Sequence, residues 1–148
     1  MTEITDKLNL PCGAQIKNRI CKGAMTEGLA DEQNRATTKH VNLYDRWSSG
    51  GSGILLIGNG QFDHRYLERP GNVVIEGPQT NEQLSRLIAY AEAGTKNNTH
   101  LWMQISHAGR QTPAAVAETP VAPSEVQLQM PGAQFGKPRA LDHEEILD

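Results

Sequence analysis

The stretch that decides the fold is GILLIGNG, residues 53–60, an unbroken apolar run that ends on glycine and asparagine. It is too short for most helices and is rich in branched side chains, so we expect a strand that is buried on both faces. Strands of this kind belong to parallel sheets, in which helices connect neighbouring strands and cover the sheet. The segments on either side of this run should therefore alternate between strand and helix.

Upstream of this run the sequence predicts a strand, a loop and a helix in that order. NRICKGAM (18–25) ends in a short apolar run that indicates a strand, and TEGLADEQNRA (26–36) has the glycine, acids and amides of a loop. A helix is expected from about Thr37 to Ser49. Its proposed inner face is formed by Val41, Tyr44 and Ser48. Gly50 and Gly51 are expected to end the helix.

Downstream, Thr80 with a glutamine three residues later has the signature of a capping box, which begins a helix. Its apolar residues recur at i, i+3, i+4 and i+7, namely Leu84, Leu87, Ile88 and Ala91. HLWMQIS (100–106) is a third strand candidate, and the proline-rich segment 107–141 is a loop of a length that is usually functional. LDHEEILD (141–148) then begins another helix, with Asp142 at its N-cap and Glu145 at N3.

The alternation of strand and helix predicts an α/β fold with a parallel sheet. LNLPCGAQIKNRI (8–20) is expected to form a hairpin that caps one end, with Pro11 and Gly13 at its turn. Three strands and little more than two helices cannot close a barrel of eight βα units, which takes about 250 residues. We therefore expect one partial domain, residues 1–148, that is truncated before a fourth strand.

Composition excludes several classes of protein. A formal net charge of −3, with basic residues scattered among acids, argues against nucleic acid or an anionic membrane as a partner. The chain has no apolar run of the roughly 20 residues that span a bilayer and no signal-like start, so a cytoplasmic protein is expected. Cys12 and Cys21 are too few for a disulfide framework or a zinc site. No metal is expected, because four histidines lack ligand spacing and are assigned to surface or packing: His40, His64, His100 and His143.

Five motifs occur together in an order and spacing that resemble the Old Yellow Enzyme family, the FMN-dependent NADH:flavin oxidoreductases and ene-reductases. They are NRICKGAMTEGLAD (18–31), GILLIGNGQF (53–62), WMQISHAGRQ (102–111), PVAPSEV (120–126) and PRALDHEEI (138–146). Any one of these matches alone would be weak, but their concordance is specific. The resemblance runs from about Leu8 to the last residue.

This resemblance implies the N-terminal part of a (β/α)8 TIM barrel, about three βα units, with FMN at the carboxyl ends of the strands. It also implies a reaction in two halves. NADH or NADPH gives a hydride to the flavin, and the reduced flavin passes a hydride to an α,β-unsaturated carbonyl compound. In the family a pair of side chains, His/His or His/Asn, holds the carbonyl oxygen of the substrate, and that pair lies on a strand that would follow Asp148. No catalytic residue is therefore assigned within this chain.

Five FMN-binding residues carry over from the resemblance: Ala24, Met25, Thr26, Asn59 and Gln104. The first three lie where the end of the first barrel strand passes along the flavin, and the Thr26 hydroxyl can donate a hydrogen bond to the ring oxygen O4. Relatives often have proline at position 24 and alanine at position 59. Gln104 matches a glutamine that pairs with the pyrimidine edge of the flavin. His107 and Arg110, in the HAGR segment, are assigned to support of the loop.

Alternatives remain for the residues and for the chain. By itself Gln104 could equally be a strand-end amide that bonds to loop backbone, and Met25 could be a packing residue. As a whole, the chain could be an N-terminal portion of an oxidoreductase that needs the missing half of the barrel. It could also be an inactive fragment or a self-associating interaction module. Unpaired edge strands favour a homo-oligomer or a complementing chain in either case. A flavodoxin-like domain is disfavoured, because no phosphate-binding glycine loop follows the first strand.

Overall fold

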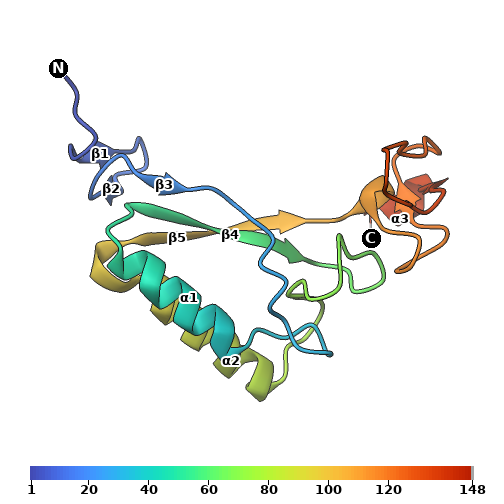
Figure 1. Ribbon diagram of the computed structural model, residues 1–148, viewed down its shortest axis with the longest axis horizontal. Coiled ribbons are helices and arrows are strands. Elements are labelled where there is room, and N and C mark those ends of the chain that lie inside the picture. Colours follow the sequence, from blue (N-terminus) through green and yellow to red (C-terminus); the bar gives the residue numbers. More distant parts are fainter. Residues whose placement is uncertain (148) are drawn as a thin grey trace.

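The computed structural model describes residues 1–147, and its centre is a parallel sheet of three strands in the order β3–β4–β5 (Figure 1). The strands are β3 (Cys21–Lys22), β4 (Ile54–Gln61) and β5 (His100–Ser106). Helix α1 (Thr38–Ser49) connects β3 to β4, and α2 (Asn81–Gly94) connects β4 to β5. The predicted α/β alternation is confirmed.

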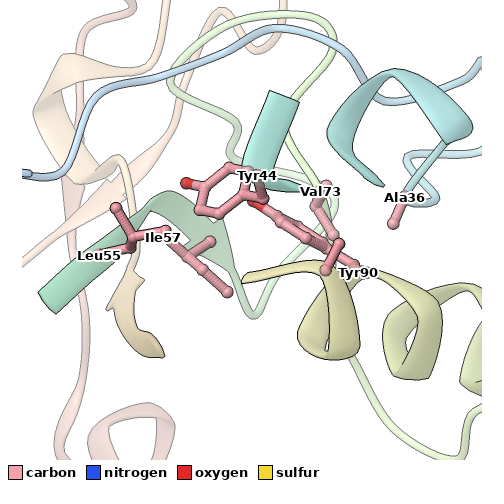
Figure 2. Close-up of a cluster of buried hydrophobic side chains, with 7 residues drawn as sticks. Ala36, Tyr44, Leu55, Ile57, Val73 and Tyr90 are labelled. Carbon is pink, nitrogen blue, oxygen red and sulfur yellow. The ribbon is translucent and has the colours of Figure 1, made fainter. Parts of the chain in front are cut away.

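Both long helices pack on the same face of the sheet and form the core with it (Figure 2). The ring of Tyr44 on α1 meets the ring of Tyr90 on α2 edge-on, with 4.6 Å between their centroids. Burying a side chain such as Leu55 or Ile57 contributes roughly 1.5–3 kcal/mol. The members of this core cluster are Ala36, Tyr44, Leu55, Ile57, Val73, Tyr90 and Ala93.

The inner face of α2 differs from the predicted one. Leu84 and Ile88 are half exposed, whereas Tyr90 and Ala93 are buried and Leu87 is partly buried against the core. The helix is rotated so that its tyrosine fills the space between α1 and the sheet. The apolar residues at helical spacing, Leu84 and Ile88, therefore lie on a side of α2 that no element within residues 1–147 covers.

The prediction that strand 53–60 is buried on both faces holds for only one face. Leu55 and Ile57 point into the core, while Leu56, on the opposite face of β4, is only partly buried. On β5, Trp102 and Gln104 are exposed. The reason is that both long helices lie on one side, so within residues 1–147 the other face of the sheet has no helical cover (Figure 1).

The two ends of the sheet carry different structures. At the amino end, β1 (Leu8–Asn9) and β2 (Gln15–Ile16) form the predicted antiparallel hairpin, with Gly13 at a φ of 89° in its turn. The strands point toward a separate lobe, drawn in orange and red in Figure 1. That lobe holds β6 (Val121–Ala122) and β7 (Arg139–Ala140), which pair in parallel.

The lobe also contains the last helix, α3 (His143–Leu147). As predicted, Asp142 and Glu145 bond reciprocally at its start, with Oδ1 of Asp142 accepting from the Glu145 amide at 2.8 Å. Two short 3₁₀ turns occur at Lys96–Asn98 and Gly109–Gln111. The last residue of the predicted helix, Asp148, lies outside the described residues. Within residues 1–147, no helix has the length and apolar character that crossing a membrane requires.

Candidate functional site

The residues assigned to flavin binding lie side by side at the carboxyl ends of the three parallel strands. Ala24, Met25 and Thr26 follow β3, Asn59 lies in β4 and Gln104 lies in β5. Ile57 pairs with Met103 and Gly60 pairs with Ile105, so Gln104 runs alongside the bulge at residues 58–59. Neighbouring strands are about 4.8 Å apart, so these segments form one continuous row.

The turn after β3 lies unusually close to β4. A Cβ atom added to Gly58 would lie 1.5 Å from the carbonyl oxygen of Met25, which no side chain can tolerate. The Met25 side chain is 54% exposed, so this residue contacts the strand through its backbone. Glycine inside a strand commonly marks such a close approach. That is the sequence signal by which this contact could have been found.

A buried polar cluster holds the same turn from the other side. The Tyr44 hydroxyl donates to Glu27 at 2.7 Å and accepts from the Gly58 amide at 3.3 Å. The Lys22 ammonium lies 3.4 Å from Glu27 and donates to the Leu56 carbonyl at 3.0 Å. Burial lowers the pKa of Lys22, although the charge of Glu27 opposes that effect. The cluster thus ties the residue after Thr26 to β3, β4 and α1.

The Thr26 hydroxyl has a partner that the sequence did not indicate. It donates to Oε2 of Glu68 at 3.0 Å, and the Asn59 side-chain amide approaches the same oxygen at 3.5 Å. Arg69 forms an ion pair with Glu68 at 2.9 Å. Burial raises the pKa of Glu68, but hydrogen bonds from Arg69 and Thr26 outweigh it and lower the pKa overall. The site therefore contains a carboxylate, brought from the loop after β4.

Asn59 occupies a backbone conformation that suits its residue type. Its φ is 51°, in the left-handed region that asparagine tolerates better than most residues. Its side-chain oxygen accepts from Nε2 of the Gln61 side chain at 2.7 Å, and Gln61 is 1% exposed. The side chain of Asn59 is therefore engaged within the protein on both its oxygen and its nitrogen.

Gln104 is different, because its side chain is exposed and makes no hydrogen bond to any part of residues 1–147. It is not used as an amide that bonds to loop backbone. A carboxamide offers two donors and an acceptor, and a flavin pyrimidine edge presents N–H beside carbonyl oxygens. The donor and acceptor set on the open face of the sheet therefore fits the ring of a flavin.

A cavity of about 710 Å³ adjoins the row of strand ends, between the loop after β4 and the C-terminal lobe. His107 lies in its wall, with its ring centroid 5.4 Å from Phe62 and 5.3 Å from Tyr66. Its Nδ1 accepts from the Gly109 amide at 3.0 Å, which is the loop-support contact expected for this histidine. Burial lowers the pKa of His107, so the imidazole is neutral near pH 7.

The fold also gathers Asp63, His64 and Glu76, whose potential ligand atoms all lie within 4.8 Å of one another. Spacing along the sequence did not reveal this group, because Glu76 comes from the far end of the loop. The Asp63 carboxylate is already bound by the Arg65 guanidinium at 2.8 Å, and the His64 and Glu76 side chains pair at 2.6 Å. The Asp63 carboxylate is therefore already paired with Arg65, and the side chains of His64 and Glu76 already bond to each other.

Comparisons with known proteins agree on one family. A family model described as "NADH:flavin oxidoreductase / NADH oxidase family" matches residues 12–148. The "NADH-dependent flavin oxidoreductase iliE" of Hypocrea jecorina is 30% identical over 154 residues, covering 94% of this chain and 38% of that protein. The "NADH oxidase" of Thermoanaerobacter brockii is 32% identical over 134 residues, covering 88% of this chain and 20% of that protein.

Solved structures share the fold over nearly the whole chain. Morphinone reductase superimposes with a TM-score of 0.82 at 18% identity, over 99% of this chain and 41% of that one. An Old Yellow Enzyme homologue from Zymomonas mobilis gives a TM-score of 0.78 at 22% identity, over 97% and 41%. The chain thus spans between a fifth and about two fifths of the length of these proteins.

Proposed function

The chain belongs to the NADH:flavin oxidoreductase / NADH oxidase family, and on this premise we propose that it supplies the N-terminal part of an FMN site in a flavin-dependent oxidoreductase. The family predicted from the five motifs is confirmed, and its description includes the predicted pair of flavin and NADH. The observation that carries the proposal is the row formed by Met25, Thr26, Asn59 and Gln104 at the carboxyl ends of adjacent parallel strands. Strand ends of this kind are where α/β barrels place their ligands.

The proposed architecture is about three βα units of a (β/α)8 barrel, with the hairpin as an end cap and residues 1–148 as one partial domain. The parallel order β3–β4–β5 and the helices on one face support it. In a closed barrel the uncovered face, which carries Gln104, would become the interior. The full activity is assigned to a larger assembly, because about three fifths of the iliE relative has no counterpart in this chain.

Within that assembly the residues of the row contact different parts of the flavin. The Gln104 carboxamide pairs with the pyrimidine edge of the ring, while the backbone of Ala24 and Met25 lies along it. Thr26 and Asn59 place polar atoms beside these contacts. The bound FMN supplies hydride chemistry, from NADH or NADPH to an alkene conjugated to a carbonyl group. The groups that hold the alkene substrate come from a complementing chain or from residues beyond these 148, whereas the row of strand ends is expected to bind FMN by itself.

A second candidate function is a self-associating interaction module without flavin. The observation that favours it is the run of exposed apolar side chains on β5, Trp102, Met103 and Ile105. Within residues 1–147, β5 pairs with no strand except β4, so its other edge can add a strand from another molecule.

An FMN titration of the 148-residue chain separates these candidates. Saturable quenching of flavin fluorescence is expected for the wild type, with circular dichroism to show that the chain is folded. Gln104→Leu should weaken binding by about tenfold, since one or two hydrogen bonds contribute about 0.5–1.5 kcal/mol each. Gln111→Leu is the matched control, because this exposed glutamine lies in a 3₁₀ turn outside the row. A folded wild-type chain that does not bind FMN would contradict the flavin-site proposal and favour the interaction module.

A further inference from the structure

We propose that Glu68 is a positioning residue of the flavin site: its carboxylate accepts the hydrogen bond of the Thr26 hydroxyl and so prevents that hydroxyl from donating to the ring. This inference rests on the proposed function and deepens it. It also replaces the role that the sequence suggested for Thr26, a hydrogen bond to the flavin oxygen O4. The contact that carries it is the 3.0 Å hydrogen bond from Thr26 Oγ1 to Glu68 Oε2.

The protonation state of Glu68 makes the direction of this bond definite. The Arg69 guanidinium lies at 2.9 Å from the carboxylate, and the side chain of Glu68 is only 26% exposed. A carboxylate can only accept hydrogen bonds, and a hydroxyl has a single proton. Thr26 is therefore the donor, and its oxygen can offer only lone pairs to a second partner.

The loop that carries Glu68 is fixed against the segment that carries Thr26. The Gly71 carbonyl accepts from the Ala30 amide at 3.0 Å, and the Asn72 side chain accepts from the Arg69 amide at 2.9 Å. Gly71 has a φ of 87°, and a Cβ atom there would lie 2.9 Å from the backbone of Gly28. The backbone at Glu68 therefore cannot move away from the Thr26 segment without disrupting these contacts, and the carboxylate is held in place by Thr26 and Arg69.

The consequence concerns the balance between oxidised and reduced flavin. A donor beside a ring carbonyl favours the electron-rich reduced form, and a nearby anion disfavours it. Glu68 removes the donor and adds the anion, although Arg69 compensates part of its charge. The wild-type site should therefore hold bound FMN at a lower reduction potential than the same site without Glu68.

A double-mutant cycle on the reduction potential of bound FMN tests the inference. Glu68→Ala frees the Thr26 hydroxyl to donate to the ring and removes a nearby anion, so it should favour reduced over oxidised FMN by about tenfold. Tenfold corresponds to about 30 mV for a two-electron couple. Thr26→Val alone should change the potential little, and in the double variant it should cancel most of the rise.

Two further variants keep the result interpretable. Glu68→Gln retains an acceptor oxygen for Thr26, so it should give a smaller rise than Glu68→Ala and provides a conservative alternative if the alanine variant does not fold. Glu76→Ala is the control, because its carboxylate lies on the same loop but pairs with His64. The inference alone is wrong if wild-type protein binds FMN and Thr26→Val lowers the potential as strongly with Glu68 present as without it. A wild-type chain that binds no FMN instead overturns the proposed function, which is recognised before any potential is measured.

Discussion

Gly58 is the residue on which the arrangement of the turn after β3 depends most directly. Any side chain here would overlap the Met25 carbonyl, since even a Cβ atom would lie 1.5 Å from it. We expect Gly58→Ala to lower the free energy of unfolding by about 3 kcal/mol, the upper end of the usual overpacking cost, because backbone has to move. Urea unfolding of the purified variant measures this directly.

The matched control is Gly23→Ala, two residues before Met25. A Cβ atom on Gly23 meets nothing within 4 Å, so we expect less than about 1 kcal/mol of change there. Equal losses for the two variants would contradict the close approach of Met25 to β4. The comparison is informative because both substitutions add the same single methyl group to neighbouring parts of one site.

Local rules predicted the elements of this chain well, because their signals are contained in adjacent residues. The strand HLWMQIS spans residues 100–106 in the structure as predicted, and Thr80 begins α2 with Gln83 closing the capping box. The inner face of α2 could not be predicted in the same way. Periodicity reports which side chains are apolar, but the choice between the Leu84 flank and the Tyr90 flank depends on where α1 and the sheet lie.

The same limit applies to the candidate site. Thr26, Asn59 and Gln104 could be assigned from motifs, because each lies at the end of a recognisable strand. Glu68 could not, because its contact with Thr26 crosses 42 positions and is created by the return of the loop after β4. Nothing in the local sequence around Glu68 distinguishes it from a solvated loop acid.

At the scale of the element, the start of α1 contains a titratable cap. Nδ1 of His40 accepts from the Thr37 amide at 3.1 Å, and His40 is 1% exposed. Burial lowers the pKa of His40 below 6.5, against an opposing effect of Glu27. As the pH falls below 6.5 the unfolded chain takes up the proton first, so the folded state loses stability by at most about 1.4 kcal/mol per pH unit.

The prediction is that His40→Gln removes this part of the pH dependence. Glutamine at the third helical position can still accept from the N-cap amide, but it does not titrate in this range. Urea unfolding at pH 7.5 and 5.5 should therefore show a smaller loss for His40→Gln than for the wild type. His143→Gln, at an exposed histidine, should keep the full loss. An unchanged loss in His40→Gln would mean that another group causes it.

At the scale of the whole molecule, the sheet has an edge and a face that no other part of the described chain covers. In the described chain β5 is an edge strand, and Ile105 at its carboxyl end is 71% exposed. Edges of this kind pair with other chains unless a charge blocks them. We therefore expect the 148-residue chain to sediment as a concentration-dependent oligomer when no complementing chain is present.

Ile105→Lys should shift that distribution toward monomer. Association through this edge would bury the lysine charge, which is unfavourable, whereas it buries the wild-type isoleucine favourably. Val126→Lys, at an exposed apolar position in the C-terminal lobe, should leave it unchanged. Sedimentation velocity over a hundredfold range of concentration distinguishes the two variants. If both shift equally, association runs through general apolar surface and not through the β5 edge. If only Ile105→Lys favours the monomer, the isolated chain associates through the edge of β5. This is the edge that would pair with the next strand of a barrel. A complementing segment should therefore compete with self-association.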